Sequence, residues 1–307
     1  MKIGIPRALL YYQYGPMWTA FFRALGAEVV LSPHTTKETL NRGTMLSIDE
    51  TCLSSKIYMG HVEWLIGKCD RIFVPRIASF GKEGILCTKF EALYDLVGNT
   101  FRDRQIKLLD CEIDLKRGKS ELSAYLHLGK KLGRGRAASF RAYLAAKQAY
   151  HHARGNCSQS LREALRLPGV KILVVAHPYV VYDEYVGKPV LEAIKSLGAQ
   201  PVLACEADGE QALESYIRLT DTLPWTMSRE LVGAVAMHHR EVDGIVLMSA
   251  FPCGPDSMVN EMLLRRLQGV PMLHLSVDAQ DGEAGLQTRL ESFIDIIHMK
   301  QEATYEA

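Results

Sequence analysis

The stretch CDRIFVPRI, residues 69–77, is nearly continuous in apolar residues. Such a run is typical of a strand in a parallel sheet that is covered on both faces. Outward from it, segments with helical spacing alternate with three further apolar runs, namely KIGIPR (2–7), AEVVLSP (27–33) and QIKLLDCEID (105–114). Short links between alternating strands and helices predict a doubly wound α/β lobe over residues 1–114.

The same alternation returns after residue 168. Strands are predicted at VKILVVAH (170–177), AQPVLACEAD (199–208), VDGIVLMSAFPC (242–253) and VPMLHLSVDAQ (270–280). Residues 115–167 differ, because they are rich in Ala, Leu, Lys and Arg at helical spacing. The sequence therefore predicts two Rossmann-like or flavodoxin-like lobes with parallel sheets, 1–114 and 168–307, joined by a helical linker over 115–167.

Composition excludes several classes of function. The chain has 307 residues, 48% of them hydrophobic, and 36 Lys and Arg against 35 Asp and Glu. A net charge near zero gives no bulk attraction to nucleic acid or to a membrane. We find no signal peptide and no transmembrane run, so a cytoplasmic, reducing setting is expected. The first strand leads into GIPRAL rather than a glycine-rich turn, which argues against a dinucleotide cofactor.

Three of the seven cysteines are predicted at helix starts: Cys52, Cys87 and Cys253. A helix N-terminus favours thiolate, the form that binds metal. All three are expected near the carboxyl ends of strands, where sites of parallel sheets lie. They therefore suggest an iron–sulfur cluster in the cleft between the lobes, with one iron left open. None belongs to a CxxC pair, and packing in the core is the competing interpretation for any single cysteine.

The other cysteines make weaker candidates. Cys111 and Cys205 follow strands and could support a double cubane, although a core or edge position is the preferred interpretation. Cys69 is expected at the opposite edge of its sheet, and Cys157 is expected to be exposed in the linker. A double cubane needs about six cysteine ligands. A single [4Fe-4S] cubane is therefore favoured.

Three polar residues accompany these cysteines. His177 follows a strand and is the candidate acid–base residue, or a partner of the cluster's open ligand, while capping of the turn before Pro178 is an equal alternative. Lys56, one turn after Cys52, could offset cluster charge, although a solvated lysine is the commoner outcome. His61 is interpreted as structural.

Several motifs resemble a known family. The strings IGIPRALLYYQYGPMWTAFFRALGAEVVLSP, SIDETCLSSKIYMGHV, VAHPYVVYDEY, PWTMSRELVGA, DGIVLMSAFPCGPDSM and VDAQDGEAGLQTRLESF occur in order along the chain. Together they resemble the acyl-CoA dehydratase activase-related proteins, relatives of the 2-hydroxyacyl-CoA dehydratase subunits and of the double-cubane cluster proteins. The resemblance covers nearly the whole chain.

The resemblance implies a cofactor and a partner. It implies that Cys52, Cys87 and Cys253 hold a [4Fe-4S] cluster between two lobes, since the family spaces its first two cysteines about 35 residues apart. It also implies an anaerobic setting and a cluster-bearing ATPase that supplies a low-potential electron for chemistry on an acyl-CoA. We find no P-loop here, so the ATPase is expected to be a separate chain. A homodimer or an oligomer with related subunits is also consistent with the family.

The chain departs from the family pattern at two places. CLSSK (52–56) lacks a proline that relatives often carry soon after the first cysteine, and Asp278 is followed by Ala279 and Gln280 in place of an acidic pair. The second departure leaves the cluster prediction intact but questions the chemistry that the acidic pair serves.

Three classes of function remain open from the sequence. The first is an ATP-dependent reductase or a dehydratase-like lyase component that uses the open iron on an acyl-CoA or another small substrate. The second is a non-catalytic low-potential electron carrier or cluster-carrying module that docks the ATPase. The third is an α/β binding protein whose cysteines are incidental.

Overall fold

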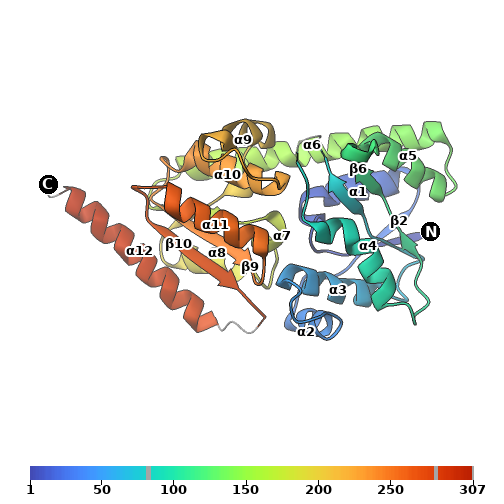
Figure 1. Ribbon diagram of the computed structural model, residues 1–307, viewed down its shortest axis with the longest axis horizontal. Helices are drawn as coiled ribbons and strands as arrows, with labels where there is room; N and C mark the ends of the chain where they lie inside the picture. Colours follow the sequence, from blue (N-terminus) through green and yellow to red (C-terminus); the bar gives the residue numbers. More distant parts are fainter. Residues whose placement is uncertain (81–83, 280–282, 306–307) are drawn as a thin grey trace. The chain divides into compact units, whose positions relative to one another are not determined.

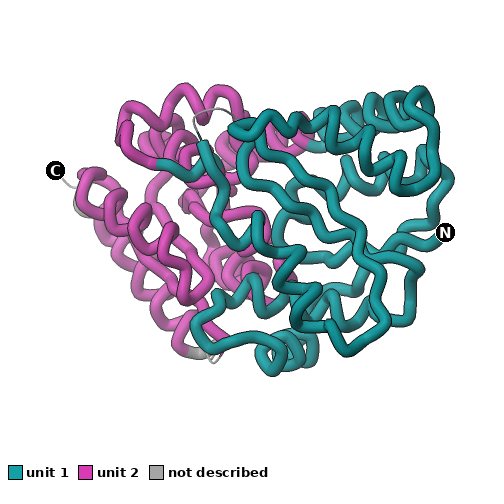
Figure 2. The backbone as a smooth tube through the Cα atoms, turned by 45° about the vertical axis from the view of Figure 1, so that its right-hand side comes forward, with its two compact units in different colours: residues 1–153, 224–226 teal, residues 154–223, 227–307 magenta. Residues whose placement is uncertain are grey.

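The computed structural model describes residues 1–80, 84–279 and 283–305. The chain forms two compact units (Figure 2). Unit 1 contains residues 1–153 and 224–226, and unit 2 contains residues 154–223 and 227–307. Both units are α/β with parallel sheets, as the sequence predicts.

Unit 1 has a parallel sheet of order β2-β1-β3-β5 and a second, two-stranded parallel sheet of β4 and β6. Its elements are β1 (Lys2–Ile5), α1 (Tyr11–Ala24), β2 (Glu28–Leu31), α2 (Lys37–Met45), α3 (Leu53–Leu65), β3 (Arg71–Phe73), β4 (Arg76–Ser79), α4 (Thr88–Thr100), β5 (Leu108–Leu109), β6 (Glu112–Asp114), a 3₁₀ turn (Leu115–Arg117) and α5 (Glu121–Lys131). Helix α6 (Arg136–Arg166) begins in unit 1 and ends in unit 2.

The stretch 69–77 is two strands rather than the single strand expected from its apolar run. Pro75 lies between β3 and β4, and a proline has no N–H to give to the ladder. The pairing nevertheless continues on both sides of it. The amide of Val74 donates to the Leu109 carbonyl and that of Arg76 donates to the Cys111 carbonyl, both at 2.9 Å. The expected strand 105–114 is divided in the same way, into β5 and β6.

Helices α2 and α3 lie side by side with their backbones in contact (Figure 1). Gly43 of α2 lies against the Lys56 carbonyl, and Gly60 of α3 lies against the Thr39 carbonyl, so closely that a Cβ on either glycine would overlap the oxygen. Only glycine permits this approach. The glycine pair therefore fixes the position of α3.

Unit 2 has one parallel sheet of order β10-β9-β7-β8. Its elements after α6 are β7 (Lys171–Val175), α7 (Pro178–Val181), α8 (Lys188–Ser196), β8 (Gln200–Leu203), a 3₁₀ turn (Ala204–Glu206), α9 (Gly209–Ser215), a 3₁₀ turn (Tyr216–Arg218), α10 (Thr226–His238), β9 (Gly244–Ala250), α11 (Gly254–Arg266), β10 (Met272–Val277) and α12 (Glu283–Tyr305).

The unit 2 sheet is covered on both faces. Leu173 and Ile245 face a core that includes Leu231 of α10 and Leu263 of α11. On the strands side chains alternate between faces. Helix α12 contacts both α8 and β10, so these two helices cover the other face. All seven residues of β9 are buried, which explains its continuous apolar run.

Candidate functional site

Each of the three predicted cysteines stands at the N-cap of a helix, which confirms the expected helix starts. Cys52 precedes α3, Cys87 precedes α4 and Cys253 precedes α11. All three are half-buried, and no thiol caps its own helix through a side-chain hydrogen bond. Unpaired N–H groups at a helix start stabilise negative charge. The three thiols therefore have the same kind of local environment, each at the start of a different helix.

Cys52 and Cys87 belong to neighbouring helices of unit 1. Helices α3 and α4 contact one another. The Cys52 Sγ lies 3.3 Å from the Ser55 Oγ, and its carbonyl accepts hydrogen bonds from the amides of Ser55 and Lys56. Because both helices run back toward the starts of strands, their N-termini lie at the carboxyl edge of the sheet. This is the edge at which parallel α/β proteins place their sites.

Residues 224–226 support the segment that precedes Cys87. Within unit 1, the amide of Ile85 donates to the Pro224 carbonyl at 3.0 Å, and the amide of Thr226 donates to the Ile85 carbonyl at 2.9 Å. Gly84 packs directly against the Thr226 side chain. The PWT of the motif PWTMSRELVGA is therefore a structural brace for the loop before Cys87, a role that sequence reasoning did not assign.

Lys56 is buried rather than solvated. Its exposed fraction is 8%, and its Nζ donates to the Asp49 carbonyl at 3.0 Å. The commoner outcome expected for a helix lysine is therefore wrong here. The cause is the close packing of α2 on α3, which covers this turn of the helix. A cation lies in the first turn after Cys52.

His61 is structural, as interpreted from the sequence. Its side chain is fully buried, and the Nε2 lies 3.0 Å from the Thr35 Oγ1. Burial lowers the pKa of His61 to about 3, and Arg7 and His34 act in the same direction. The imidazole is therefore neutral at physiological pH.

In unit 2, His177 and Cys253 are linked through Asp256. The His177 Nε2 lies 2.9 Å from the Asp256 Oδ1, with both side chains buried. Asp256 also shares a side-chain hydrogen bond with Cys253. Burial acts to raise the pKa of Asp256, but the interactions with His177 and Cys253 outweigh it and hold the pKa below the ordinary value. An ionised carboxylate thus joins the two predicted site residues.

The His177 side chain does not cap the turn before Pro178. His177 occupies the N-cap of α7, but its ring makes no capping hydrogen bond and stacks on Tyr179 with ring centroids 5.0 Å apart. The Nδ1 is buried and has no hydrogen-bond partner within residues 1–80, 84–279 and 283–305. With the Nε2 held by a carboxylate, the Nδ1 is the ring nitrogen that is left for another group.

Glu230 is a further member of this region that sequence reasoning missed. Burial raises the pKa of Glu230, while Arg154 and His177 act to lower it. The motif PWTMSRELVGA contains it, but a glutamate on an amphipathic helix gives no signal of its own. Three different motifs therefore supply His177, Glu230 and Asp256, which all belong to unit 2, to one region.

The four remaining cysteines have a different character. Burial raises the pKa of Cys69, Cys111, Cys157 and Cys205, that of Cys205 to about 12. Cys157 is half-buried and hydrogen-bonded to Tyr182, so its expected exposure in the linker is wrong. Tyr182 also bonds the Cys205 thiol and donates to Glu206 at 2.7 Å. These thiols stay protonated at neutral pH.

Within residues 1–80, 84–279 and 283–305, no three His, Cys, Asp or Glu side chains gather at metal-binding distance. No described helix is long and apolar enough to cross a membrane.

Comparisons with solved structures give only distant likenesses. The SBP FpvC from Pseudomonas aeruginosa in complex with Mn²⁺ is 14% identical, with 99% of each chain covered and a TM-score of 0.31. A FpvC mutant from the same organism is 15% identical, covers 98% of this chain and 100% of its own, and has a TM-score of 0.28. ZnuA is 11% identical, with coverage of 97% and 98% and a TM-score of 0.24. Likenesses at these TM-scores define neither the fold nor the function of this chain.

No curated protein matches the chain. A family profile, in contrast, matches the chain. The profile described as "CoA enzyme activase uncharacterised domain" matches residues 2–206, which is about two thirds of the chain and includes all of the elements from β1 to β8. The chain therefore belongs to the CoA enzyme activase family that this domain defines.

Proposed function

We propose that the chain binds one [4Fe-4S] cluster through Cys52, Cys87 and Cys253, in a role related to the activation of acyl-CoA dehydratases. The observation that carries the proposal is the shared environment of the three thiols, each at a helix N-cap and half-buried. Three cysteine thiolates are a donor set that suits a cubane with one iron open. When bound, the cluster would supply low-potential one-electron chemistry.

The other thiols support a single cubane rather than a double one. Cys111 and Cys205, the two alternatives, have pKa values raised by burial. A ligand to iron must be a thiolate, so deprotonating these two would cost more than deprotonating an ordinary cysteine. The proposal therefore uses only the helix-start cysteines, and it requires the two lobes to bring Cys253 to the other two.

The chain's own residues have defined tasks in this proposal. Lys56 places a buried positive charge one turn after Cys52 and would offset the negative charge of the bound group. Asp256 is hydrogen-bonded to Cys253 and offers an acceptor for the thiol proton, which must leave when Cys253 becomes a ligand. His177 holds that carboxylate through Nε2 and would act as the acid–base residue through Nδ1.

The partner that we propose is a separate cluster-bearing ATPase, and the substrate is an acyl-CoA or another small molecule. Membership of the CoA enzyme activase family supports a link to acyl-CoA enzymes. The alternative, a non-catalytic electron carrier, uses the same cysteines and differs only in whether a substrate is turned over.

Anaerobic reconstitution tests the cluster. We expect the wild-type chain to take up four irons and four sulfides, and Ser at Cys52, Cys87 or Cys253 to abolish stable incorporation. Cys69→Ser and Cys157→Ser are the matched controls and should leave the iron content unchanged. A triple variant C52S/C87S/C253S that still carries a full cluster would show that the assignment of these three ligands is wrong.

Reduction by dithionite tests the partner. We expect slow or partial reduction of the chain alone and full reduction when the ATPase and ATP are added. Equally fast and complete reduction without ATP would favour the simple electron carrier.

A further inference from the structure

An open groove of about 740 Å³ lies at the edge of the unit 2 sheet where β9 and β10 begin. Three segments of unit 2 form it, namely residues 239–243 between α10 and β9, residues 268–271 between α11 and β10, and residues 297–301 of α12. Its volume is in the range of sites that bind small organic molecules. Cys253 and His177 follow the opposite, carboxyl ends of β9 and β7, so the groove is separate from the proposed cluster site.

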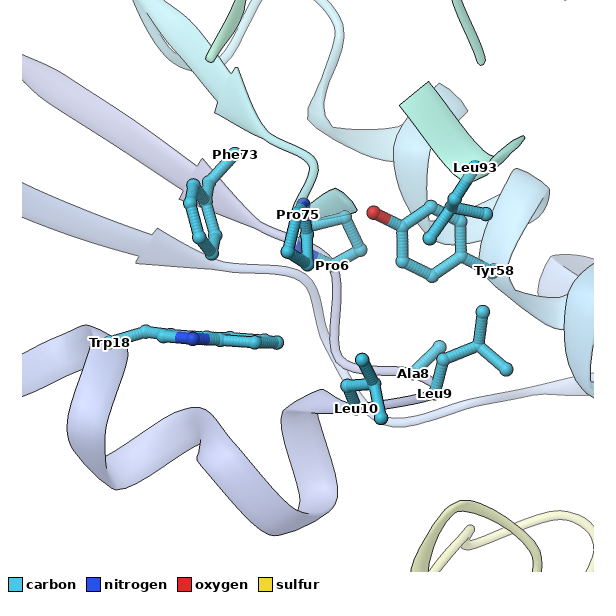
Figure 3. Close-up of a pocket in the computed structure, with 9 residues that line it drawn as sticks. All are labelled: Pro6, Ala8, Leu9, Leu10, Trp18, Tyr58, Phe73, Pro75 and Leu93. Atoms are coloured by element: carbon cyan, nitrogen blue, oxygen red, sulfur yellow. The ribbon is translucent and has the colours of Figure 1, made fainter. Parts of the chain in front are cut away.

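The cavity that Figure 3 shows is of another kind. It lies in unit 1 between Trp18, Tyr58 and Leu93. Its room is about 10 Å³ and its accessible wall is apolar, so it suits neither an organic molecule nor a water, which needs several polar partners. The groove in unit 2 is therefore the better candidate for a ligand.

The floor of the groove in unit 2 is aliphatic. Val242, Val270 and Pro271 are half-buried there, and Ile297 of α12 is 2% exposed. Val242 and Val270 also pack against the core of unit 2, which holds the floor in place. An apolar group that covers these side chains would remove further apolar surface from water, which is favourable. The floor therefore suits a ligand with an aliphatic part.

The rim of the groove is positively charged. Arg240 and Lys300 lie on it with exposed side chains, and no carboxylate of residues 1–80, 84–279 and 283–305 pairs with Arg240. Asp243 also lines the groove, but it has two donors of its own. Its Oδ2 accepts from the Lys171 amide at 2.8 Å and its Oδ1 from the Gln301 Nε2 at 2.9 Å. Two cations thus stand against one carboxylate, so the rim favours an anion.

We propose that this groove binds an organic anion, whose carboxylate or phosphate group pairs with Arg240 and Lys300 and whose aliphatic part covers Val270 and Ile297. The arginine fork matches the oxygens of either anionic group. Because the rim is open to water, the head group keeps part of its hydration and no charge has to be buried. His239, the remaining titratable residue of the described lining, donates from Nδ1 to the Val235 carbonyl at 3.0 Å and adds no negative charge.

Calorimetric titration of the full chain with a matched series of probes tests the ligand class. Octanoate and octyl phosphate share one tail and differ in the head group, and octanol is their neutral counterpart. We expect at least one of the two anions to bind with a Kd of about 1 mM or tighter, and octanol to bind about ten-fold more weakly. The tighter of the two anions identifies the head group.

Acetate and inorganic phosphate test the aliphatic floor, because they carry a head group without the tail. Each should bind more weakly than its eight-carbon counterpart, since it buries less apolar surface. Inorganic phosphate that binds as tightly as octyl phosphate, or acetate as tightly as octanoate, would overturn the proposal. So would octanol that binds as tightly as the anions, or the failure of both anions to bind.

Substitution at the rim places the site on the molecule. Arg240→Gln and Lys300→Gln should each raise the Kd of the tighter anion by about five-fold, as expected for a partly solvated ion pair. Arg265→Gln is the matched control and should leave the Kd unchanged, because Arg265 pairs with Glu261 on the exposed face of α11 and does not line the groove. Equal affinities of Arg240→Gln and Arg265→Gln would show that the anion binds elsewhere and would overturn the proposal.

Discussion

The His177 Nε2 lies 2.9 Å from the Asp256 Oδ1, and this hydrogen bond joins the loop after β7 to the first turn of α11. The two residues are 5% and 7% exposed. In such surroundings the carboxylate is worth more to the fold than an exposed ion pair, because its loss leaves the imidazole without a partner.

Asp256→Ala should therefore destabilise the chain. We expect the free energy of unfolding to fall by about 2–4 kcal/mol, the usual cost of breaking a buried pair at one partner. Urea denaturation measures it. Glu261→Ala is a matched control on the same helix, because Glu261 pairs with Arg265 at an exposed position and should cost less than about 1 kcal/mol. Equal losses for the two variants would contradict the role given to Asp256.

Substitution at the glycine contact between α2 and α3 should also be costly. A methyl group on Gly43 would overlap the Lys56 carbonyl, and one on Gly60 would overlap the Thr39 carbonyl. We expect Gly43→Ala and Gly60→Ala to lower the free energy of unfolding by about 1–3 kcal/mol each, since the helices must move apart. Thermal and urea denaturation give the values.

Gly155→Ala is the control for these two variants and should have the opposite sign. Gly155 lies inside α6, and no atom stands within 4 Å of an added Cβ. Alanine there should stabilise by about 0.5–1 kcal/mol through helix propensity. If Gly43→Ala stabilised the chain as well, the close contact between α2 and α3 would be wrong.

Much of the fold follows from the sequence, because it depends on local patterns. The apolar runs of β7 and β9 and the helix starts at Cys52 and Cys253 are set by residues close in the chain. The apolar pattern gives no signal of the break between β3 and β4, because the apolar residues Val74 and Ile77 stand on either side of Pro75.

The site was less accessible to sequence reasoning, because its contacts join distant segments. The burial of Lys56 depends on the packing of α2, and the bond between His177 and Asp256 joins residues 79 positions apart. Neither contact leaves a periodic signal. The residue types were enough to identify Cys52, Cys87, Cys253 and His177 as candidates. Their polar partners can be identified only from the tertiary structure.

The buried His61 should make stability depend on pH. Its pKa is about 3 in the folded chain and ordinarily about 6.5, so the unfolded chain binds more protons between these values. Stability should therefore fall as the pH drops below about 6.5, by up to about 2 kcal/mol at pH 5 from this residue. Urea denaturation at pH 7 and pH 5 should show a smaller loss for His61→Gln than for the wild type. An unchanged pH dependence in the variant would exclude His61 as the source.

Lys56 should tune the proposed cluster through its charge. The side chain is buried one turn after Cys52 and is fixed by the Asp49 carbonyl, so it cannot turn away into solvent without losing that bond. A positive charge near a cluster favours the reduced, more negative form, and the potential depends on such charges. We expect Lys56→Met to lower the reduction potential of the reconstituted cluster by tens of millivolts, as an order of magnitude, with the iron content preserved. Lys68→Met is the control, because Lys68 is exposed three residues beyond the end of α3 and lies over the Trp64 ring. If Lys56→Met and the wild type have the same reduction potential at equal iron content, the Lys56 charge does not act on the cluster. Its burial would then contribute only to packing.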